Sequence, residues 1–383
     1  MSIPLSSRSD IAPFHVMEVF DQAERRAATG AEVVRLEVGQ PATAAPRGVI
    51  EAAHRTLDTD RLGYTSSQGI VELREKLAGH YDHWYGIDVD PDHIVITAGA
   101  SGGFTLAFLA AFDIGQRVAV TVPGYPCYRN ALQAIGVEVV PLMTTIEDNF
   151  QPTLASLEAL GPIDGLIVTS PSNPTGTMLS DAQLGEVIGW CQRNAVTVVS
   201  DEIYHGLTYE GSAGTALAHS QDLIVVNSFS KYFSMTGWRL GWVVVPEHVV
   251  SPIMRFASNL LLAPASLSQH AAVAAFDCHD ELGEHLVRYE RNRQVLLEGL
   301  PTVGLDRLAP AQGAFYVYAD VSHVTDDSQR LCAEWLDQLG IAATPGTDFD
   351  PWNGHEYVRF SFCGATEEME RAIELLHGWA PNS

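Results

Sequence analysis

The chain has 383 residues, of which 46% are hydrophobic, and a formal net charge of −25 at pH 7. This length predicts two domains, or one large α/β domain with a smaller partner, and leaves ample apolar material for a buried core. Phosphate groups are bound by clustered Lys and Arg, so the acidic balance argues against nucleic acid and against an anionic membrane surface as partners.

Lysine is nearly absent: only Lys76 and Lys231 are present, so a lysine-dependent mechanism has two candidates. The five cysteines are scattered without a CxxC spacing, and the 14 histidines show neither HxxxH nor HExxH. These patterns predict reduced thiols in a cytoplasmic protein and no metal site. The N-terminus lacks a signal-peptide pattern, and glycines interrupt the apolar stretch Ile94–Phe112, so neither a leader nor a membrane span is predicted.

In the middle of the chain, short apolar runs rich in Val and Ile alternate with longer helix-compatible stretches such as Asp181–Asn194. The runs are His93–Thr97, Arg117–Val122, Gly165–Ser170, Val196–Ser200, Leu223–Asn227 and Leu240–Val245. They are apolar on both faces, which is typical of the strands of a parallel sheet covered by helices. The pattern predicts an α/β sheet from about Pro46 to about Cys278.

The C-terminal part of the chain has a different order. A long amphipathic stretch, Asp280–Leu300, comes first; the predicted strands Phe315–Ala319 and Tyr357–Ser361 and the predicted helices Asp327–Leu339 and Glu367–Trp379 follow. This order predicts a smaller α+β domain. We therefore divide the chain into a large domain of residues 46–280 and a small domain of residues 1–45 and 281–383, although the order alone does not say how the N-terminal residues pack.

Polar and small residues follow five of the predicted strands. They are Gly99-Ala100-Ser101, Pro123-Gly124-Tyr125-Pro126, Pro171-Ser172-Asn173-Pro174-Thr175-Gly176, Asp201-Glu202-Ile203-Tyr204 and Ser228-Phe229-Ser230-Lys231. In an open parallel sheet, ligands bind beyond the carboxyl ends of the strands. Any one of these segments could be ordinary turn chemistry, but five together predict a binding site at one edge of the sheet.

The first part of this site is suited to a phosphate. Small residues that open a helix leave free backbone N–H groups at the positive end of the helix dipole, and these bind anions. The hydroxyls of Ser228 and Ser230 add donors, and Arg239 adds a full positive charge.

The remaining residues are suited to an aromatic aldehyde. Tyr125 offers a flat face for a ring, and Asp201 can hold a proton on a ring nitrogen. Asn173 and Tyr204 can donate hydrogen bonds to a phenolic oxygen, and Lys231 can form a Schiff base. A phosphate, a ring nitrogen, a phenolic oxygen and an aldehyde together describe pyridoxal 5′-phosphate (PLP).

The sequence resembles the class I/II aminotransferases, which are fold-type I PLP-dependent enzymes. The resemblance runs from about Glu37 to Phe362. The motifs that carry it are Gly63-Tyr64-Thr65-Ser66-Ser67-Gln68-Gly69, Pro123-Gly124-Tyr125-Pro126, Asn173-Pro174-Thr175-Gly176, Asp201-Glu202-Ile203-Tyr204, Ser228-Phe229-Ser230-Lys231, Gly237-Trp238-Arg239-Leu240-Gly241 and Tyr357-Val358-Arg359-Phe360-Ser361. It implies a large, mostly parallel sheet covered by helices, plus a smaller α+β domain.

The resemblance also implies a role for each matching residue. Lys231 would hold PLP covalently and move the proton, Asp201 would pair with the ring nitrogen, and Asn173 and Tyr204 would bind the ring oxygen. Tyr125 would stack on the ring. The phosphate would be held by Ala100, Ser101, Ser228, Ser230 and Arg239, and by Tyr64 of a neighbouring subunit in a homodimer. Arg359 would bind the substrate α-carboxylate, helped by Gly39 and Asn173.

Ordinary structural roles remain open for most of these residues. Asp201 could be a helix N-cap, Arg239 could pair with a surface carboxylate, and Arg359 could lie on a solvated strand face. Tyr125 could belong to the core, and Tyr64 could pack within its own chain. The sequence departs from the family in the Pro345–Phe349 loop, because Asp350 follows where glycine is common, and this puts the substrate preference in doubt.

The leading hypothesis is an aminotransferase that moves an amino group from an amino acid to a 2-oxo acid by a ping-pong Schiff-base mechanism. A C–S lyase, a decarboxylase or a biosynthetic cyclase would use the same cofactor residues. A non-catalytic regulator of this fold is a weaker alternative, because the resemblance begins near residue 37 and leaves little room for a DNA-binding extension, and because the acidic charge argues against DNA. A Rossmann dehydrogenase ranks last, because no GxGxxG follows an early strand. The segment Asn259–Pro264, expected near the pocket, carries no cation, which favours a neutral or apolar substrate.

Overall fold

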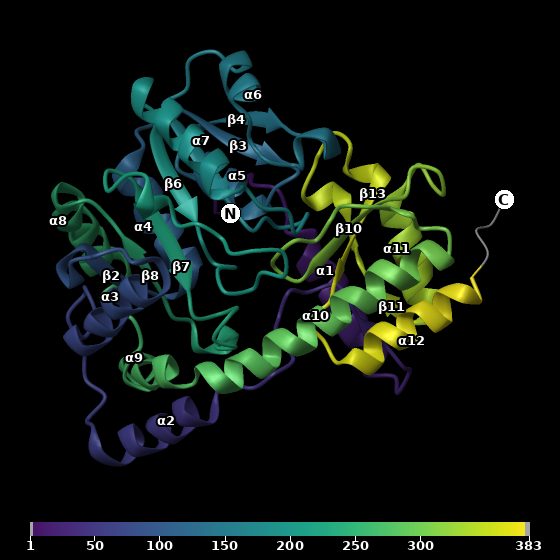
Figure 1. The fold of residues 1–383 in the computed structure, drawn as a ribbon, viewed down its shortest axis with the longest axis horizontal. Coiled ribbons are helices and arrows are strands. Elements are labelled where there is room, and N and C mark those ends of the chain that lie inside the picture. The colour runs from purple at the N-terminus through teal and green to yellow at the C-terminus, as the bar shows by residue number, and fades with distance from the viewer. Residues whose placement is uncertain (1–2, 380–383) are drawn as a thin grey trace.

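A seven-stranded sheet forms the centre of the larger part of the molecule in the computed structural model, which describes residues 3–379 (Figure 1). The strand order is β2-β8-β7-β6-β5-β3-β4. The strands are β2 Ile94–Thr97, β3 Arg117–Val122, β4 Glu138–Met143, β5 Gly165–Thr169, β6 Thr197–Asp201, β7 Ile224–Ser228 and β8 Gly241–Val244. The bounds of each of the six predicted runs agree with those of a strand to within one residue.

Two features of this sheet were not predicted. Strand β4 alternates between exposed and buried residues and contains Pro141, which an edge strand tolerates because its outer side needs no hydrogen bonds. Strand β8 runs antiparallel to both of its neighbours, which agrees with the predicted mostly parallel sheet, but the sequence did not indicate which strand would be antiparallel. Residues 229–240, which connect β7 to β8, contain a short 3-10 turn and no α-helix, whereas a parallel crossover usually contains a helix.

Helices cover both faces of the sheet. They are α2 Arg47–Thr59, α3 Val71–Tyr85, α4 Gly99–Ala111, α5 Pro126–Ala134, α6 Leu154–Ala159, α7 Asp181–Arg193, α8 Glu247–Phe256 and α9 Ser266–Val273. Side chains alternate between faces along each strand: Val225 packs in the core beneath α3, α7 and α9, and its neighbours Ile224 and Val226 pack beneath α4, α5 and α8. None of the helices within residues 3–379 is both long and apolar enough to cross a membrane.

The C-terminal part, together with α1 and β1 of the N-terminal segment, builds a second, smaller set of sheets. An antiparallel sheet has the order β12-β13-β10-β9, and a two-stranded parallel sheet joins β1 to β11. Their strands are β1 Val34–Arg35, β9 Arg307–Leu308, β10 Tyr316–Asp320, β11 Ile341–Ala342, β12 Thr344–Pro345 and β13 Tyr357–Ser361; the helices of this part are α1 His15–Ala27, α10 His279–Thr302, α11 Ser328–Leu339 and α12 Thr366–His377. Figure 1 shows α10 as a long helix that runs from the region of α9 to α12.

The remaining helical segments are short. They are the 3-10 turns Ser7–Ser9, Pro91–His93, Ile146–Asp148, Ala216–Ala218, Thr236–Trp238, Ala274–Asp277, Gly346–Asp348 and Gly354–Glu356, and the π-helical turn Ala257–Leu261.

The direction of the strands decides where the site can lie. Strands β3, β5, β6 and β7 are parallel to one another, and β2 and β7 are both antiparallel to β8, so β2 runs the same way as β7. The carboxyl ends of all five strands therefore meet at one edge of the sheet. All five predicted polar segments follow these ends, so the fold brings them together as expected.

Candidate active site

A cavity of about 330 Å³ lies at this edge of the sheet. All of the predicted site residues except Ser228 and Tyr64 line it: Gly39, Ala100, Ser101, Tyr125, Asn173, Asp201, Tyr204, Ser230, Lys231, Arg239 and Arg359. The segment Asn259–Pro264 is not among the lining residues, so its lack of a cation cannot explain substrate preference within this chain. The cavity thus contains a lysine, a carboxylate and two guanidinium groups.

Lys231 follows β7 and reaches the cavity, where its Nζ donates a hydrogen bond to the carbonyl oxygen of Gly39 at 2.6 Å. Burial lowers the pKa of Lys231 to about 8, and the positive charges of Arg359 and Arg239 act in the same direction. A substantial fraction of the amine is therefore neutral near pH 8, and a neutral amine can act as a nucleophile or a base.

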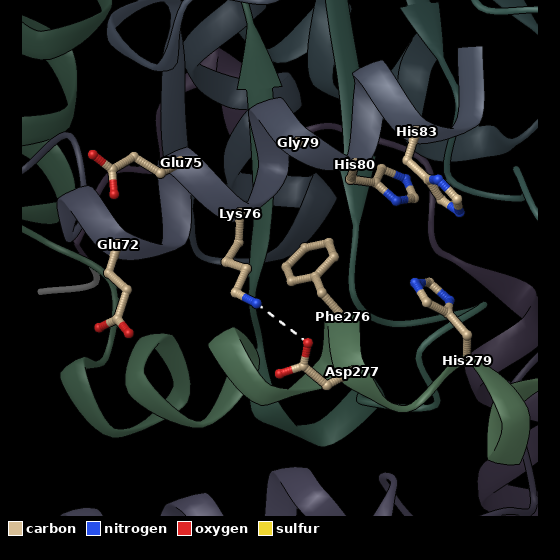
Figure 2. Close-up of a pocket in the computed structure, with 9 residues that line it drawn as sticks. All are labelled: Glu72, Glu75, Lys76, Gly79, His80, His83, Phe276, Asp277 and His279. Carbon is tan, nitrogen blue, oxygen red and sulfur yellow. Dashed lines mark hydrogen bonds and ion pairs between the residues drawn. The ribbon is translucent and has the colours of Figure 1, made fainter. Parts of the chain in front are cut away.

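The other lysine is in a different setting. Figure 2 shows Lys76 on α3, in a separate pocket, with its Nζ 3.2 Å from a carboxylate oxygen of Asp277. The Lys76 side chain is 40% exposed, and none of the predicted site residues lines that pocket. Lys76 is therefore ion-paired at the surface and away from the predicted site, so Lys231 is the better candidate for covalent chemistry.

Asp201 ends β6, and its buried carboxylate is held from both sides. Oδ2 accepts a hydrogen bond from the Tyr128 hydroxyl, and Oδ1 accepts one from the Ile203 N–H at 3.0 Å. The helix N-cap alternative is wrong, because a turn and no helix follows Asp201, and the carboxylate lines the cavity. Burial raises the pKa of Asp201 to about 6, and the two hydrogen bonds oppose that rise, so the group is mostly ionised at neutral pH.

Tyr128 was missed from the sequence, although it also lines the cavity. It lies in the first turn of α5, three residues after Tyr125, and its hydroxyl accepts a hydrogen bond from Thr169 Oγ1 at 3.1 Å while it donates to Asp201. The rings of Tyr125 and Tyr128 meet edge to face, with centroids 5.3 Å apart. The i, i+3 spacing was the only sequence signal that the two side chains share a face.

An anion-binding corner is formed where α4 begins. The preceding Ala98 has no side chain able to cap the helix, so the first N–H groups of α4 remain free. Gly99 has φ +72°, and a Cβ there would lie 2.7 Å from a guanidinium nitrogen of Arg239, so only glycine allows this close approach. Ser230 lines the same cavity. Ser228 does not: its hydroxyl donates a hydrogen bond to Ser230 Oγ at 2.8 Å.

Arg359 is buried on β13, so the alternative of a solvated strand face is wrong. Its Nη1 donates to the Asn173 amide oxygen at 2.9 Å, and its Nη2 donates to the carbonyl oxygen of Glu37. The guanidinium carbon lies 4.4 Å from the ring centroid of Tyr316 and 4.6 Å from that of Phe349, so aromatic faces hold its plane in place. A planar, oriented guanidinium of this kind is suited to a carboxylate.

Tyr316 is a second residue that the sequence did not reveal. Its hydroxyl lies 2.9 Å from the hydroxyl of Tyr204, and both side chains are buried. A Cβ on Gly39 would lie 1.8 Å from the Tyr316 hydroxyl, so only glycine fits at this position. These contacts join the small sheet, the edge of the large sheet and residues 37–40 around one cavity.

Apolar side chains of the N-terminal segment form one wall of the cavity, with Gln40 of the same segment beside them. The apolar residues are Phe14, Val16, Met17, Phe20 and Val38. The first four belong to α1 or directly precede it, and no motif marks them, because their spacing is that of any amphipathic helix.

Two further expectations concern residues outside the cavity. Tyr64 is 88% exposed, so its side chain lies almost entirely in solvent when a single chain is considered. Asp350 is buried, and its Oδ1 accepts hydrogen bonds from the N–H groups of Trp352 at 2.8 Å and Asn353 at 3.0 Å. Its carboxylate therefore serves a local turn and is not presented to the cavity.

Comparisons with known proteins agree with this geometry. The model of the family "aminotransferase class I and II" matches residues 31–376. A valine–pyruvate aminotransferase of Mycobacterium tuberculosis is 45% identical, and the alignment covers all of both chains. The crystal structure of an aminotransferase from the same organism superposes with a TM-score of 0.97 at 45% identity, covering 99% of this chain and 100% of that one.

More distant relatives have the same fold. The aspartate aminotransferase of Thermus thermophilus, solved with maleate, has a TM-score of 0.93 at 30% identity and covers 98% of this chain and 100% of that one. These structures confirm the predicted fold-type I architecture, and the lyase, decarboxylase and cyclase alternatives are not favoured. The chain belongs to the class I and II aminotransferases and is an enzyme that transfers amino groups.

Proposed function

We propose that the cavity binds PLP and that the enzyme moves an amino group from an apolar amino acid to a small 2-oxo acid in ping-pong fashion. The observation that carries the proposal is that one cavity is lined by a lysine with a lowered pKa, a buried carboxylate and the free N-terminus of α4 beside Arg239. Together these groups match the aldehyde, the ring nitrogen and the phosphate of PLP.

The residues present fit each part of the cofactor. The N–H groups at Ala100 and Ser101, the Ser230 hydroxyl and Arg239 would hold the phosphate, with Ser228 orienting Ser230. Asp201 would hold a proton on the ring nitrogen, Asn173 and Tyr204 would donate to the ring oxygen, and Tyr125 would stack on the ring. When bound, PLP supplies the electron sink that stabilises negative charge at the substrate α-carbon.

The chain's own residues then carry out the remaining tasks. The neutral amine of Lys231 can accept and return the proton at the α-carbon. Arg359 would bind the substrate α-carboxylate, with Asn173 and the backbone at Gly39 beside it. The bond that the Lys231 amine makes to the Gly39 carbonyl shows that this amine can reach the same groups.

The apolar wall supports an apolar amino donor. Among the described residues that line the cavity, the cationic side chains are Lys231, Arg239 and Arg359. The proposal assigns all three, so the cavity of this chain leaves no cation for a side-chain carboxylate such as that of aspartate. The name of the valine–pyruvate relative points to the same class of donor and acceptor, whereas several relatives near 30% identity are named aspartate aminotransferases.

A panel of amino donors tests this proposal. Valine, leucine, alanine and aspartate would be offered with pyruvate or 2-oxoglutarate, and half-reactions followed at the cofactor absorbance. We expect valine or leucine with pyruvate to give the highest kcat/KM, since the wall buries an aliphatic side chain. A preference for aspartate would contradict the proposed substrate class, and no reaction with any amino acid would contradict transamination itself.

We also propose a homodimer in which Tyr64 reaches the phosphate of the neighbouring subunit. Support comes from its 88% exposure and from the exposed apolar side chains of Leu260, Leu261 and Leu262, which a monomer would leave in water. A phenolic hydroxyl donates a short, strong hydrogen bond to a phosphate.

Subunit mixing tests the shared site. Tyr64→Ala and Lys231→Ala, each impaired alone, would be unfolded and refolded together. With shared sites, a mixed dimer has one site with both changes and one with neither, so activity returns. If mixing gives no more activity than the separate variants, Tyr64 serves its own chain and the claim fails.

We further propose that residues 46–280 form the large domain and residues 1–45 with 281–383 the small domain of a cytoplasmic protein. The parallel pairing of β1 with β11 supports the assignment of the N-terminal segment, and the five free thiols support the compartment. Limited proteolysis of the holoenzyme tests the domain boundaries: we expect first cuts near residues 45 and 280.

A further inference from the structure

The apolar wall begins at the start of helix α1, where the preceding residue has no side chain that can cap the helix. Helix α1 starts at His15, and the residue before it, Phe14, has an extended backbone with φ −103° and makes no side-chain cap. The first N–H groups of a helix lack partners within the helix and need an acceptor from elsewhere. Phe14, Val16, Met17 and Phe20 all lie in or beside this first part of α1 and all line the cavity.

The acceptor comes from a residue more than 300 positions away. Oδ2 of Asp348 accepts a hydrogen bond from the Val16 N–H at 3.0 Å, which is the bond that an N-cap side chain normally makes to the second helical residue. Asp348 is 0% exposed. Burial raises the pKa of this carboxyl group, while the Val16 N–H favours its charged form.

The loop that carries Asp348 also touches the rest of the site. The next residue, Phe349, stacks on the Arg359 guanidinium at 4.6 Å. The Asp348 carbonyl oxygen accepts a hydrogen bond from Arg129 Nη2 on α5 at 2.7 Å. One short segment therefore links the start of α1 to the proposed carboxylate-binding arginine and to the helix that follows Tyr125.

We propose that Asp348 is a positioning residue that caps α1 and holds its first turn as the wall of an apolar subsite for the substrate side chain. This rests on the proposed function, because the subsite has meaning only if amino acids bind beside Arg359. With the cap in place, Val16 and Met17 stay over the cavity and favour donors with branched aliphatic side chains. Without it, the first turn frays and a large apolar side chain loses its contact surface.

The experiment uses the holoenzyme and three variants. Asp348→Ala removes the cap, and Asp348→Asn keeps an acceptor oxygen without the charge. Asp327→Ala is the matched control, because Asp327 caps α11 through the Arg330 N–H at 3.0 Å and lies outside the cavity. Two quantities are measured for each: the hydrogen–deuterium exchange of the α1 amides, and the ratio of kcat/KM for valine to that for alanine.

We expect Asp348→Ala to speed exchange in the first turn of α1 about fivefold and to lower the valine-to-alanine ratio by about the same factor, which corresponds to loss of one helix cap. Asp348→Asn should recover at least half of both effects. Asp327→Ala should speed exchange in α11 and leave the ratio unchanged.

Three results would overturn the inference: unchanged α1 exchange in Asp348→Ala, a ratio that stays constant although α1 exchanges faster, or an equal change of the ratio in Asp327→Ala. If Asp348→Ala does not fold, the same comparisons apply to Asp348→Asn. Failure of the proposed function is distinguishable, because the wild-type enzyme would then turn over neither amino acid while the exchange measurement would still report on the cap.

Discussion

The two halves of the cavity are built in different ways. The cofactor half consists of residues at or near strand ends at one edge of the large sheet: Ala100, Ser101, Tyr125, Asn173, Asp201, Tyr204, Ser230, Lys231 and, just before β8, Arg239. The substrate half is assembled from the N-terminal segment and the small sheet: Phe14, Val16, Met17, Phe20, Val38, Gly39, Tyr316 and Arg359. Strand direction alone gathers the first group, whereas the second depends on how separate elements pack.

This difference predicts different consequences for mutation. Changes in the cofactor half should remove chemistry for every substrate, because all substrates meet the same cofactor. Changes in the substrate half should alter KM and discrimination while leaving the cofactor bound. The predictions below separate these outcomes, in order of expected effect.

Lys231→Ala should have the largest effect, lowering kcat by at least about 10⁴-fold, because it removes both the nucleophile and the proton-transfer base. Borohydride reduction followed by peptide mapping should find the cofactor on Lys231 in the wild type and no covalent adduct in the variant. Lys76→Ala is the control and should behave like the wild type, since Lys76 pairs with Asp277 outside the cavity. A reduced adduct on Lys76 would contradict the assignment of Lys231 as the lysine that binds the cofactor.

Asp201→Asn should lower kcat about 10²- to 10³-fold while some PLP still binds, because a neutral amide no longer favours a proton on the ring nitrogen. Glu202→Gln is the matched control: Glu202 is the next residue and also buried, but its carboxylate accepts from Thr215 Oγ1 at 3.0 Å and the Ala216 N–H at 2.8 Å, outside the cavity. We expect Glu202→Gln to affect thermal stability more than turnover. Near-normal kcat in Asp201→Asn would falsify its role in the cofactor half.

Arg359→Lys should lower kcat/KM for amino acids about 10- to 100-fold, mainly through KM, because an ammonium cannot form two parallel bonds to a carboxylate. The cofactor spectrum should stay that of the wild type. Arg293→Lys provides the control, since Arg293 is also buried but bonds to the Ala311 carbonyl at 2.7 Å away from the cavity. If the wild type accepts amines without a carboxylate as readily as amino acids, Arg359 has been misassigned.

Tyr128→Phe should have the smallest effect, about three- to tenfold in kcat/KM at neutral pH. The Tyr128 hydroxyl stabilises the charged form of Asp201 and so opposes the rise of its pKa to about 6. Its loss should raise that pKa further and move the acid limb of the pH–rate profile upward by about one pH unit. Tyr318→Phe is the control, because the buried Tyr318 hydroxyl has no hydrogen-bond partner in the structure. An unmoved acid limb would show that Tyr128 does not tune Asp201.

The sequence was sufficient to predict the position of most strands of the large sheet. Fully buried strands consist of contiguous Val and Ile runs, and this signal located six strands of the large sheet to within one residue. It failed for β4, whose alternating pattern and Pro141 are those of an edge strand, and for the direction of β8, which is joined to β7 without a helical crossover.

The sequence by itself also determined the cofactor half of the site. Its residues lie in short motifs at strand ends, so residue type, order along the chain and parallel pairing were enough to place Asp201 and Lys231 in one cavity. The tertiary structure alone decided the rest. It brought Tyr128 to Asp201, Tyr316 to Tyr204, and the Asp348 carboxylate to the Val16 N–H. The physical reason is that such contacts join elements separated by up to hundreds of residues, and only the packing of helices and sheets into one core determines which side chains meet.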